Sequence, residues 1–409
     1  MKSSSNFNGW KITQLGNICD ISSSKRIFAS EYKTSGIPFY RGKEIIEKFN
    51  KKPISTELFI SPERFNEINN KFGVPKEGDI LLTSVGTLGI PYLVGNEDFY
   101  FKDGNLTWFK QFKSCNSRFL FFWFQSPFAK HQIETKSIGS TQKALTIDIL
   151  KSFTIHLPPI KVQNKIVAIL SSIDDKIELN NKINRNLEAQ AQAIFKSWFI
   201  DFEPFKNGKF IDSELGRIPE GWKVESIYSI SEVIYGAPFS SNLFNNKQLG
   251  TPIIRIRDLP NEASNTYTTE SHPKGYLIKQ GDIVVGMDGE FKAYLWGGDN
   301  AWLNQRICVF KSKLNVSTAF VMFSIVPLLN EVESSELATT VIHLGKNDID
   351  RFKIILPKLN ILKEFNRISI PIFDAIIKNK RESQRLAQLR DTLLPKLMSG
   401  EIDVSDVAV

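Results

Sequence analysis

An internal repeat is the feature that most constrains how this 409-residue chain can fold. Residues 9–21, GWKITQLGNICDI, start with Gly-Trp-Lys and continue with alternating apolar and polar residues. The polar, turn-rich stretch at 212–221 leads into WKVESIYSISEVI, which again follows a glycine and alternates in the same way. Such alternation is typical of a half-buried strand. The middle of the chain therefore looks like a second beginning, with Trp222 matching Trp10 as a structural anchor.

Later signals recur in the same order, as expected for a duplicated domain. IPFYRGKEI at 37–45 is echoed by TPIIRIRDL at 251–259, which aligns Arg41 with Arg255. KEGDILLTSVG is echoed by KQGDIVVGMDG, and FTIHLP by FKIILP. A chain of this length suits two domains plus connectors. The sequence predicts two copies of one domain that contains strands and helices.

A long helix is predicted after each copy, because residues 160–200 lack Pro and Gly and carry apolar residues at coiled-coil spacing. One hypothesis is that each helix packs only on its own domain; the favoured one is that the two pack on each other, antiparallel. Pro371 predicts a kink or a late start in the second helix. The predicted seam, in which Asn180 and Asn379 would fix the register, consists of Ile166, Leu170, Ile173, Ile177, Asn180, Leu187, Ala191, Ile194, Trp198, Phe365, Ile372, Ile376, Asn379, Leu386, Leu393 and Leu397.

Several classes of activity lack their sequence signals here. There is no GxxxxGK followed by Ser or Thr for ATP, and LPPI at 157–160 lacks the acidic or amide residue of a methyltransferase motif. The four histidines have no metal-ligand spacing, and the three cysteines suggest neither a metal site nor a disulfide framework. No apolar run is long enough to span a bilayer, so a cytoplasmic location without membrane contact is expected. A net charge of +8 is compatible with nucleic acid but does not establish it.

One stretch resembles a metal-dependent nuclease site, because Asp282, Glu290 and Lys292 follow one another in GDIVVGMDGEFK. In the first copy Asp79 matches Asp282, but Thr87 and Gly89 stand where the other two would be. A residue present in both copies indicates scaffold, so the nuclease is the weaker interpretation.

At this point the sequence resembles a known family, the specificity (S) subunits of type I restriction-modification systems, the HsdS family. The resemblance covers nearly the whole chain and is strongest in GRIPEGWK, in LPPIKVQNKIVAILSSIDDKIELNNKINRNLEAQAQAIFKSWF and in the C-terminal LRDTLLPKLMSGEIDV. The chain departs from the family pattern at Pro371 and in TTVIHLGKNDI, a looser copy of STQKALTIDIL.

The resemblance implies an α+β fold with two pseudo-repeated target recognition domains separated by two long antiparallel coiled-coil helices. It also implies a non-catalytic, DNA-binding subunit of a defence system, in which each domain recognises one half of a split site. Its partners would be double-stranded DNA, two methyltransferase (M) subunits and restriction (R) subunits. No cofactor is expected on this chain; S-adenosylmethionine, ATP and Mg would belong to the partners. The predicted regions are 1–157 and 206–356 for the domains, and 158–205 and 357–409 for the helices and tail.

Recognition of bases needs Arg, Asn or Gln at base edges, and Lys, Arg, Ser or Thr on phosphates. The candidates in the first domain are Lys25, Arg26, Arg41, Lys43, Thr83, Ser84, Gln142 and Lys143. Those in the second domain are Arg255, Arg257, Lys292, Gln305, Arg306 and Lys346. Arg41 and Arg255 are favoured because they recur beside equivalent strands, although each could instead pair with a carboxylate of its own domain. Two alternatives stay open: a nuclease using Asp282, Glu290 and Lys292, and a two-lobed protein-interaction scaffold without DNA binding.

Overall fold

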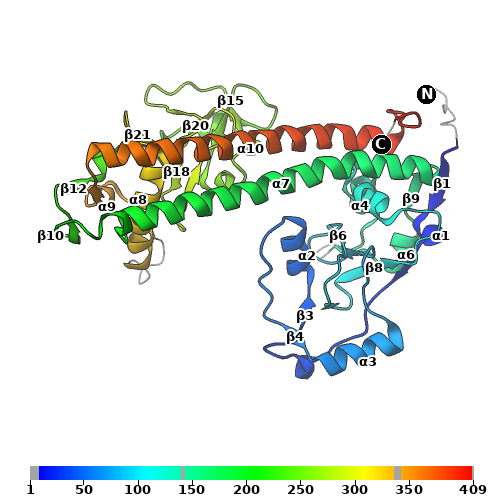
Figure 1. The fold of residues 1–409 in the computed structure, drawn as a ribbon. Coiled ribbons are helices and arrows are strands. Elements are labelled where there is room, and N and C mark those ends of the chain that lie inside the picture. Colours follow the sequence, from blue (N-terminus) through cyan, green and yellow to red (C-terminus); the bar gives the residue numbers. More distant parts are fainter. Residues whose placement is uncertain (1–8, 140–142, 336–341, 408–409) are drawn as a thin grey trace. The chain divides into compact units, whose positions relative to one another are not determined.

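Two compact units make up the chain in the computed structural model, which describes residues 9–139, 143–335 and 342–407 (Figure 1). One unit comprises the residues up to Asp174 together with those from Ala387 onward, and the other comprises Asp175–Leu386. Each unit holds one domain of strands and helices together with part of two long helices, α7 (Ile160–Phe199) and α10 (Leu359–Ser399).

The first domain is built around a four-stranded antiparallel sheet with the order β2-β8-β5-β6. A three-stranded sheet, β4-β3-β7, and a strand pair, β1-β9, complete it. The strands are β1 (Lys11–Gln14), β2 (Asp20–Ser22), β3 (Ile37–Tyr40), β4 (Phe59–Ile60), β5 (Ile80–Thr83), β6 (Pro91–Leu93), β7 (Tyr100–Phe101), β8 (Leu106–Lys110) and β9 (Thr154–Leu157). The helices are α1 (Leu15–Ile18), η1 (Ala29–Glu31), α2 (Gly42–Phe49), α3 (Pro62–Phe72), α4 (Ser117–Gln125), α5 (Pro127–Lys136) and α6 (Ile147–Lys151).

The second domain has a four-stranded antiparallel sheet of the same kind, β13-β21-β18-β19, beside a five-stranded sheet, β14-β16-β15-β20-β17. Its strands are β10 (Phe210–Ser213), β11 (Gly216–Pro219), β12 (Lys223–Ser226), β13 (Ser231–Tyr235), β14 (Phe244–Asn245), β15 (Thr251–Ile254), β16 (Tyr267–Thr268), β17 (Leu277–Ile278), β18 (Ile283–Gly286), β19 (Ala293–Leu295), β20 (Ala301–Leu303), β21 (Ile307–Ser312) and β22 (Lys353–Leu356). Its helices are η2 (Glu203–Phe205), η3 (Ile227–Ser229), η4 (Ser241–Leu243), η5 (Ile256–Asn261), α8 (Thr318–Ser335) and α9 (Lys346–Ile349).

The internal repeat is visible in the pairing of the strands. In both domains the strand that begins at the lysine of the Gly-Trp-Lys triplet pairs antiparallel with the last strand before a long helix, as β1 with β9 and β12 with β22. In both, one parallel pair stands out, β3 with β7 and β15 with β20. The predicted α+β class with two copies of one domain is therefore confirmed.

The repeated Lys-x-Gly-Asp segment forms the same turn in each domain. Gly78 and Gly281 have φ of +87° and +86°, a left-handed conformation that glycine adopts without steric cost. The carboxylate Oδ2 of Asp79 accepts the backbone N–H of Lys76 at 3.0 Å, and that of Asp282 accepts the N–H of Lys279 at 2.8 Å. The turn delivers the chain into β5 or β18, whose residues are all buried.

The long helices run antiparallel to each other within the first unit. Ile166 and Leu170 of α7 belong to the same buried cluster as Leu394 and Leu397 of α10. Further along α7, the Oδ1 atom of Asp174 lies 2.9 Å from the Nη1 atom of Arg390. Because rising numbers on one helix meet falling numbers on the other, the orientation is antiparallel.

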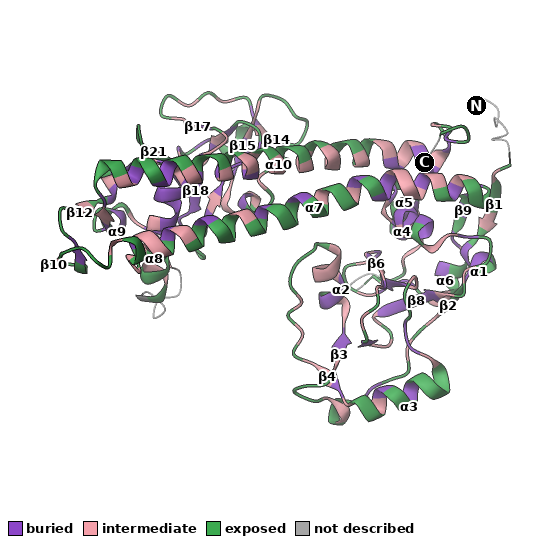
Figure 2. Ribbon diagram, in the orientation of Figure 1, coloured by how far each residue is buried: buried purple, intermediate pink, exposed green. Residues whose placement is uncertain are grey.

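Within the second unit the helices pack on the domain as well as on each other (Figure 2). The ring of Phe199 on α7 lies 5.1 Å from that of Phe365 on α10 and 5.0 Å from that of Phe320 on α8, between ring centroids. The two helices therefore pack on each other, as the favoured hypothesis predicts. The hypothesis that each helix packs only on its own domain is wrong, because α7 also packs on the second domain. The apolar face is wider than a coiled-coil seam, because each helix must bury residues toward two neighbours.

The structure buries or half-buries each residue of the predicted seam. Those that are buried are Ile166, Leu170, Ile173, Asn180, Ala191, Phe365, Ile376 and Leu397. Those that are half-buried are Ile177, Leu187, Ile194, Trp198, Ile372, Asn379, Leu386 and Leu393. The heptad pattern missed six apolar residues of the two helices that the structure buries, Phe195, Phe199, Leu362, Phe373, Leu394 and Met398.

Pro371 does not delay the start of the second helix, which begins at Leu359 and continues to Ser399 without interruption. Proline removes the N–H that would bond to the carbonyl of Arg367. Both residues are exposed, so water can satisfy that carbonyl. The expectation of a late start was wrong for this reason.

Four polar side chains form a layer between the helices in the second unit. The amide Nδ2 of Asn180 donates to the Oγ of Ser383 at 3.3 Å, and the Nδ2 of Asn379 donates to the Oδ1 of Asn184 at 2.9 Å. The repeat aligns Asn180 with Asn379 and Asn184 with Ser383, so the two contacts are images of each other. The Nδ2 atom of Asn184 also donates to the carbonyl of Ile376 at 3.2 Å. The sequence pattern did not identify Asn184 as a residue of the helix interface.

Asn184→Ala is expected to lower the free energy of unfolding by about 1–3 kcal/mol, because it leaves the amide of Asn379 and the carbonyl of Ile376 without their partner. Urea unfolding followed by circular dichroism measures this. Asn181→Ala, at an exposed position on the same helix, is the matched control. Equal losses in the two variants would contradict a specific role for the layer.

Candidate nucleic-acid interface

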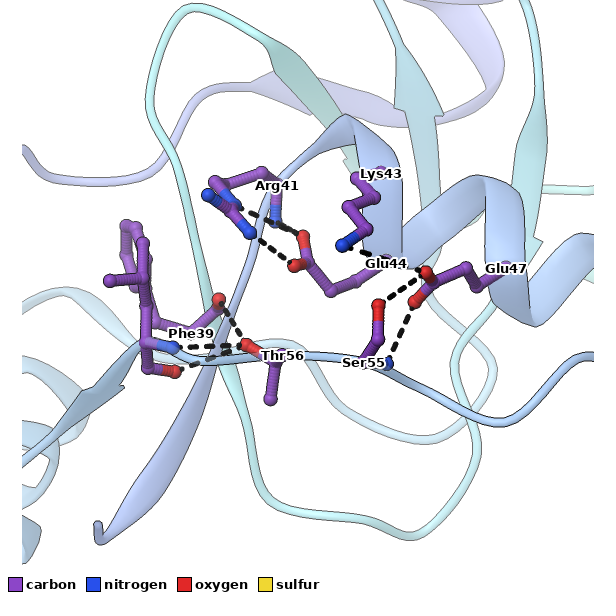
Figure 3. Close-up of polar contacts among 8 residues, drawn as sticks. Phe39, Arg41, Lys43, Glu44, Glu47, Ser55 and Thr56 are labelled. Carbon is purple, nitrogen blue, oxygen red and sulfur yellow. Dashed lines mark hydrogen bonds and ion pairs between the residues drawn. The ribbon is translucent and has the colours of Figure 1, made fainter. Parts of the chain in front are cut away.

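Arg41 lies at the end of β3, where the chain turns into α2. Its guanidinium donates to Glu44 from both Nε and Nη2, the latter to Oε1 at 2.7 Å, and its backbone N–H donates to Oε2 at 2.7 Å (Figure 3). Glu44 is fully buried, whereas 34% of the Arg41 side chain is exposed. The hydrogen bond to Glu44 raises the pKa of Arg41 above its usual value. The carboxylate thus holds one edge of the guanidinium and fixes its orientation.

Arg255 occupies the equivalent place between β15 and η5 of the second domain. Its Nε and its backbone N–H both donate to the Oδ2 atom of Asp258, at 3.1 and 3.0 Å. Aspartate is one methylene shorter than glutamate, and here the Nη2 atom donates to the hydroxyl of Thr266 instead. The position of Thr266 corresponds to Leu58 in the first domain, since Ile253 and Phe39 each donate their N–H to that residue's carbonyl at 2.9 Å. The two domains therefore anchor the same arginine with different partners.

A polar concavity of about 460 Å³ lies beside Arg255 in the second domain. Arg255 and Arg257 contribute its cations, and Asp258 its carboxylate. The rest of the lining is polar except for Ala263, and consists of Asn246, Gln248, Asn261, Asn265, Thr266 and Tyr267. Amide and guanidinium groups are those that pair with base edges in DNA.

The four amide residues of this concavity were missed by the sequence analysis. They come from the segment before β15, from the end of η5 and from the connection between η5 and β16, far enough apart that no short motif joins them. The sequence did offer one signal: Asn and Gln residues, NNKQ at 245–248, shortly before a strand that an arginine follows.

The other candidates of the first domain lie at several places on its surface. Arg26 is exposed and its Nε lies 3.1 Å from Asp103, and Lys43 lies 4.0 Å from Glu47 of the same helix (Figure 3). The ammonium of Lys25 lies 4.6 Å from the ring centroid of Phe72. Lys143 is exposed, and Gln142 lies outside the described residues. Contacts of these residues with DNA stay predictions.

Thr83 and Ser84 are not available to DNA, which corrects the sequence expectation. They are 1% and 2% exposed. The hydroxyl of Thr83 accepts the N–H of Ile90 at 2.9 Å, and that of Ser84 donates to the carbonyl of Leu82 at 3.1 Å. Both hydroxyls stabilise the chain reversal after β5 because a buried hydroxyl needs an internal partner.

The remaining candidates of the second domain are exposed. Arg257 lines the concavity beside Arg255. Arg306 forms a cluster with Asp288 and His343, and its Nη1 atom lies 3.6 Å from the Asp288 carboxylate. Gln305 directly precedes Arg306 in the chain. The ammonium of Lys292 lies over the ring of Tyr294, and Lys346 forms an ion pair with Asp350.

Asp282, the first residue of the suspected nuclease triplet, has a structural role. Its Oδ2 atom accepts the N–H of Lys279 and, at 2.9 Å, the hydroxyl of Tyr276. Asp79 bonds in the same way to Lys76 and to the indole of Trp108. Within the described parts of the chain, no three His, Cys, Asp or Glu side chains come together in a way that could hold a metal ion. The duplicated turn thus accounts for Asp282 without catalysis.

The three cysteines are free and buried. Burial raises the pKa of Cys19, of Cys115 and of Cys308 to about 12, so these thiols stay protonated near neutral pH. The helices that the structure describes include none with the length and apolar character to cross a membrane.

Comparison with known proteins identifies the family. A model of the type I restriction modification DNA specificity domain matches residues 8–189 and again residues 219–390. The chain belongs to the type I restriction-modification DNA specificity family. This confirms the resemblance found in the sequence, and makes the recognition of a DNA sequence the function of the chain.

Similar proteins support this assignment. The chain is 31% identical over 353 residues to the specificity subunit of the type I restriction enzyme MjaIX of Methanocaldococcus jannaschii, covering 81% of this chain and 79% of that one. It is 26% identical over 340 residues to the HindI specificity subunit of Haemophilus influenzae, covering 65% and 73%. Its fold is similar to the crystal structure of a type I S subunit from M. genitalium, with a TM-score of 0.57 at 14% identity over 97% of this chain and 98% of that one.

Asp282→Asn is expected to change how stability depends on pH. Burial raises the pKa of Asp282, so between its unfolded and native pKa values the native state binds the proton more tightly. The Asp282 contribution to the free energy of unfolding therefore falls as pH rises from about 4 through the native pKa. The neutral amide of Asn does not titrate, so the variant does not lose stability in this way. In thermal unfolding, the melting temperature of the variant minus that of the unmodified chain should therefore increase from acid to neutral pH. A constant or falling difference would contradict the assignment.

Proposed function

We propose that the chain is the non-catalytic subunit that directs a type I restriction-modification complex to a bipartite DNA target. Each domain recognises one half-site. The observation that carries this proposal is the duplicated arginine constellation. Arg41 and Arg255 occupy equivalent strand ends, and each is held by a carboxylate three residues further along. Duplication of the frame supports two DNA-binding sites of one kind.

Differences around the two arginines support unlike half-sites. Among the residues that the structure describes, the Arg41 guanidinium donates hydrogen bonds only to Glu44, whereas that of Arg255 donates to both Asp258 and Thr266. In the first domain the chain after the arginine forms the eight-residue helix α2, whereas in the second it forms the short 3₁₀ helix η5. The two surfaces therefore present different groups to DNA.

The proposed partners follow from the family and from the repeat. Two copies of one methyltransferase subunit suit a chain with two copies of one domain and an image-related helix contact. The restriction subunits join this complex, and S-adenosylmethionine, ATP and Mg belong to the partner subunits. The chain then acts as the scaffold that places catalytic subunits on a chosen sequence.

The test is to express the chain with the methyltransferase subunit encoded beside it in a host that lacks adenine methylation, and to map methylation by long-read sequencing. We expect one split sequence with a fixed, non-specific gap. The methyltransferase subunit expressed alone is the control and should leave the genome unmethylated.

Other outcomes separate the alternatives. A single unsplit site would contradict the assignment of one half-site to each domain. A stable complex without methylation, and without salt-dependent duplex binding, would favour the protein-interaction scaffold. Cleavage of DNA by the purified chain with Mg²⁺, abolished in Glu290→Gln, would favour the nuclease.

A further inference from the structure

Arg41 and Arg255 each keep one edge of the guanidinium free. A guanidinium has five N–H groups. In Arg41 the carboxylate of Glu44 engages Nε and Nη2, and in Arg255 the groups engaged are also Nε and Nη2. No hydrogen bond or ion pair joins Nη1 of either arginine to another described residue. The edge formed by Nη1 and the remaining N–H of Nη2 thus presents parallel donors in an orientation that the rest of the domain has already fixed.

We propose that these two arginines each recognise a guanine, Arg41 in one half-site and Arg255 in the other. The inference rests on the proposed function and identifies the base that each site contains. The major-groove edge of guanine carries two neighbouring acceptors, O6 and N7, which match the paired donors of a guanidinium edge.

The carboxylates explain why a base, and not a phosphate, fits these arginines. Phosphate contacts depend on net positive charge. Glu44 and Asp258 offset the charge of Arg41 and Arg255, at 2.7 and 3.1 Å, while leaving the donors of the free edge in place. A guanidinium whose charge is offset, and whose two free N–H donors are held in one orientation, is suited to a neutral pair of acceptors such as O6 and N7 of guanine.

The surroundings of Arg255 suit a base edge as well. Its side chain is only 24% exposed and lines a concavity, so a ligand must enter to reach it. The neighbouring Asn246, Gln248 and Asn265 carry both donors and acceptors. Phosphate oxygens only accept, whereas base edges do both, so the lining matches bases adjacent to the guanine.

The experiment maps the methylated sequence for the unmodified chain and for variants, each co-expressed with the methyltransferase subunit. The unmodified chain should require a G·C pair in each half-site. Arg255→Gln should lose that requirement at one position of one half-site, with discrimination there reduced on the order of 10- to 100-fold. Arg41→Gln should do so in the other half-site only.

Thr266→Val tests the orientation of the guanidinium without removing it. Valine keeps the shape of threonine but cannot accept the N–H of Nη2, so discrimination should weaken at the same position that Arg255→Gln affects. Discrimination in the first half-site should be unchanged, because Arg41 is oriented by Glu44 and the first domain has Leu58 at the position of Thr266. Arg351→Gln is the matched control, since Arg351 also pairs with a carboxylate three residues away, is 77% exposed and does not line the concavity.

The outcomes separate this inference from the proposed function. No split methylated sequence from the unmodified chain would overturn the proposed function itself. A split sequence with no required G·C pair in one half would overturn the guanine assignment alone. A uniform loss of methylation in Arg255→Gln with an unchanged sequence requirement indicates a phosphate contact, and also overturns it. If Arg255→Gln abolishes methylation altogether, Thr266→Val decides, because an unchanged sequence requirement in that variant contradicts the proposal.

Discussion

The closing of each domain by an antiparallel strand pair is the constraint on which the rest of the structure depends. The strand that opens a domain pairs with the strand that ends it, as in Lys11–Gln14 with Thr154–Leu157. The closing strand is followed within three residues by a long helix in both repeats. The chain therefore enters and leaves each domain at one place, and the departing helix carries an apolar face that its own domain covers only in part. Burying that face against the equivalent helix satisfies both repeats with one interface.

Polar groups give this interface a defined alignment. Leucine and isoleucine pack against one another in several registers at similar cost, but a buried amide tolerates only the register that supplies its partners. The Nδ2 donors of Asn180 and Asn379 find acceptors in Ser383 and Asn184, so the repeat supplies an acceptor for the amide N–H groups at two places. Alignment of the helices is thus coupled to the duplication of the sequence.

The sequence predicted the parts of the molecule that depend on periodicity and repetition. The two domains, the two helices and the burial or half-burial of the seam follow from patterns of apolar residues. The pattern could not reveal Asn184, because an amide at that position shows its role only when the carbonyl of Ile376 is opposite it. It likewise placed Thr83 and Ser84 on a DNA-binding surface, since a hydroxyl after a buried strand looks the same whether it bonds inward or outward. The amides near Arg255 were missed because they converge only after β14, β15 and β16 have paired.

The anchoring of Arg255 has a consequence for how recognition can evolve or be engineered. Shortening the acid by one methylene leaves one guanidinium nitrogen without the carboxylate, and the hydroxyl of Thr266, just before the neighbouring strand β16, accepts from that nitrogen. Arginine, acid and hydroxyl therefore form an inherited set in which a change in one member alters what is required of the others. Transplanting Arg255 alone into another recognition domain would deliver a flexible side chain, whereas moving it with Asp258 and Thr266 would deliver an aimed one. The smallest exchangeable module of this surface is a triad and not a single residue.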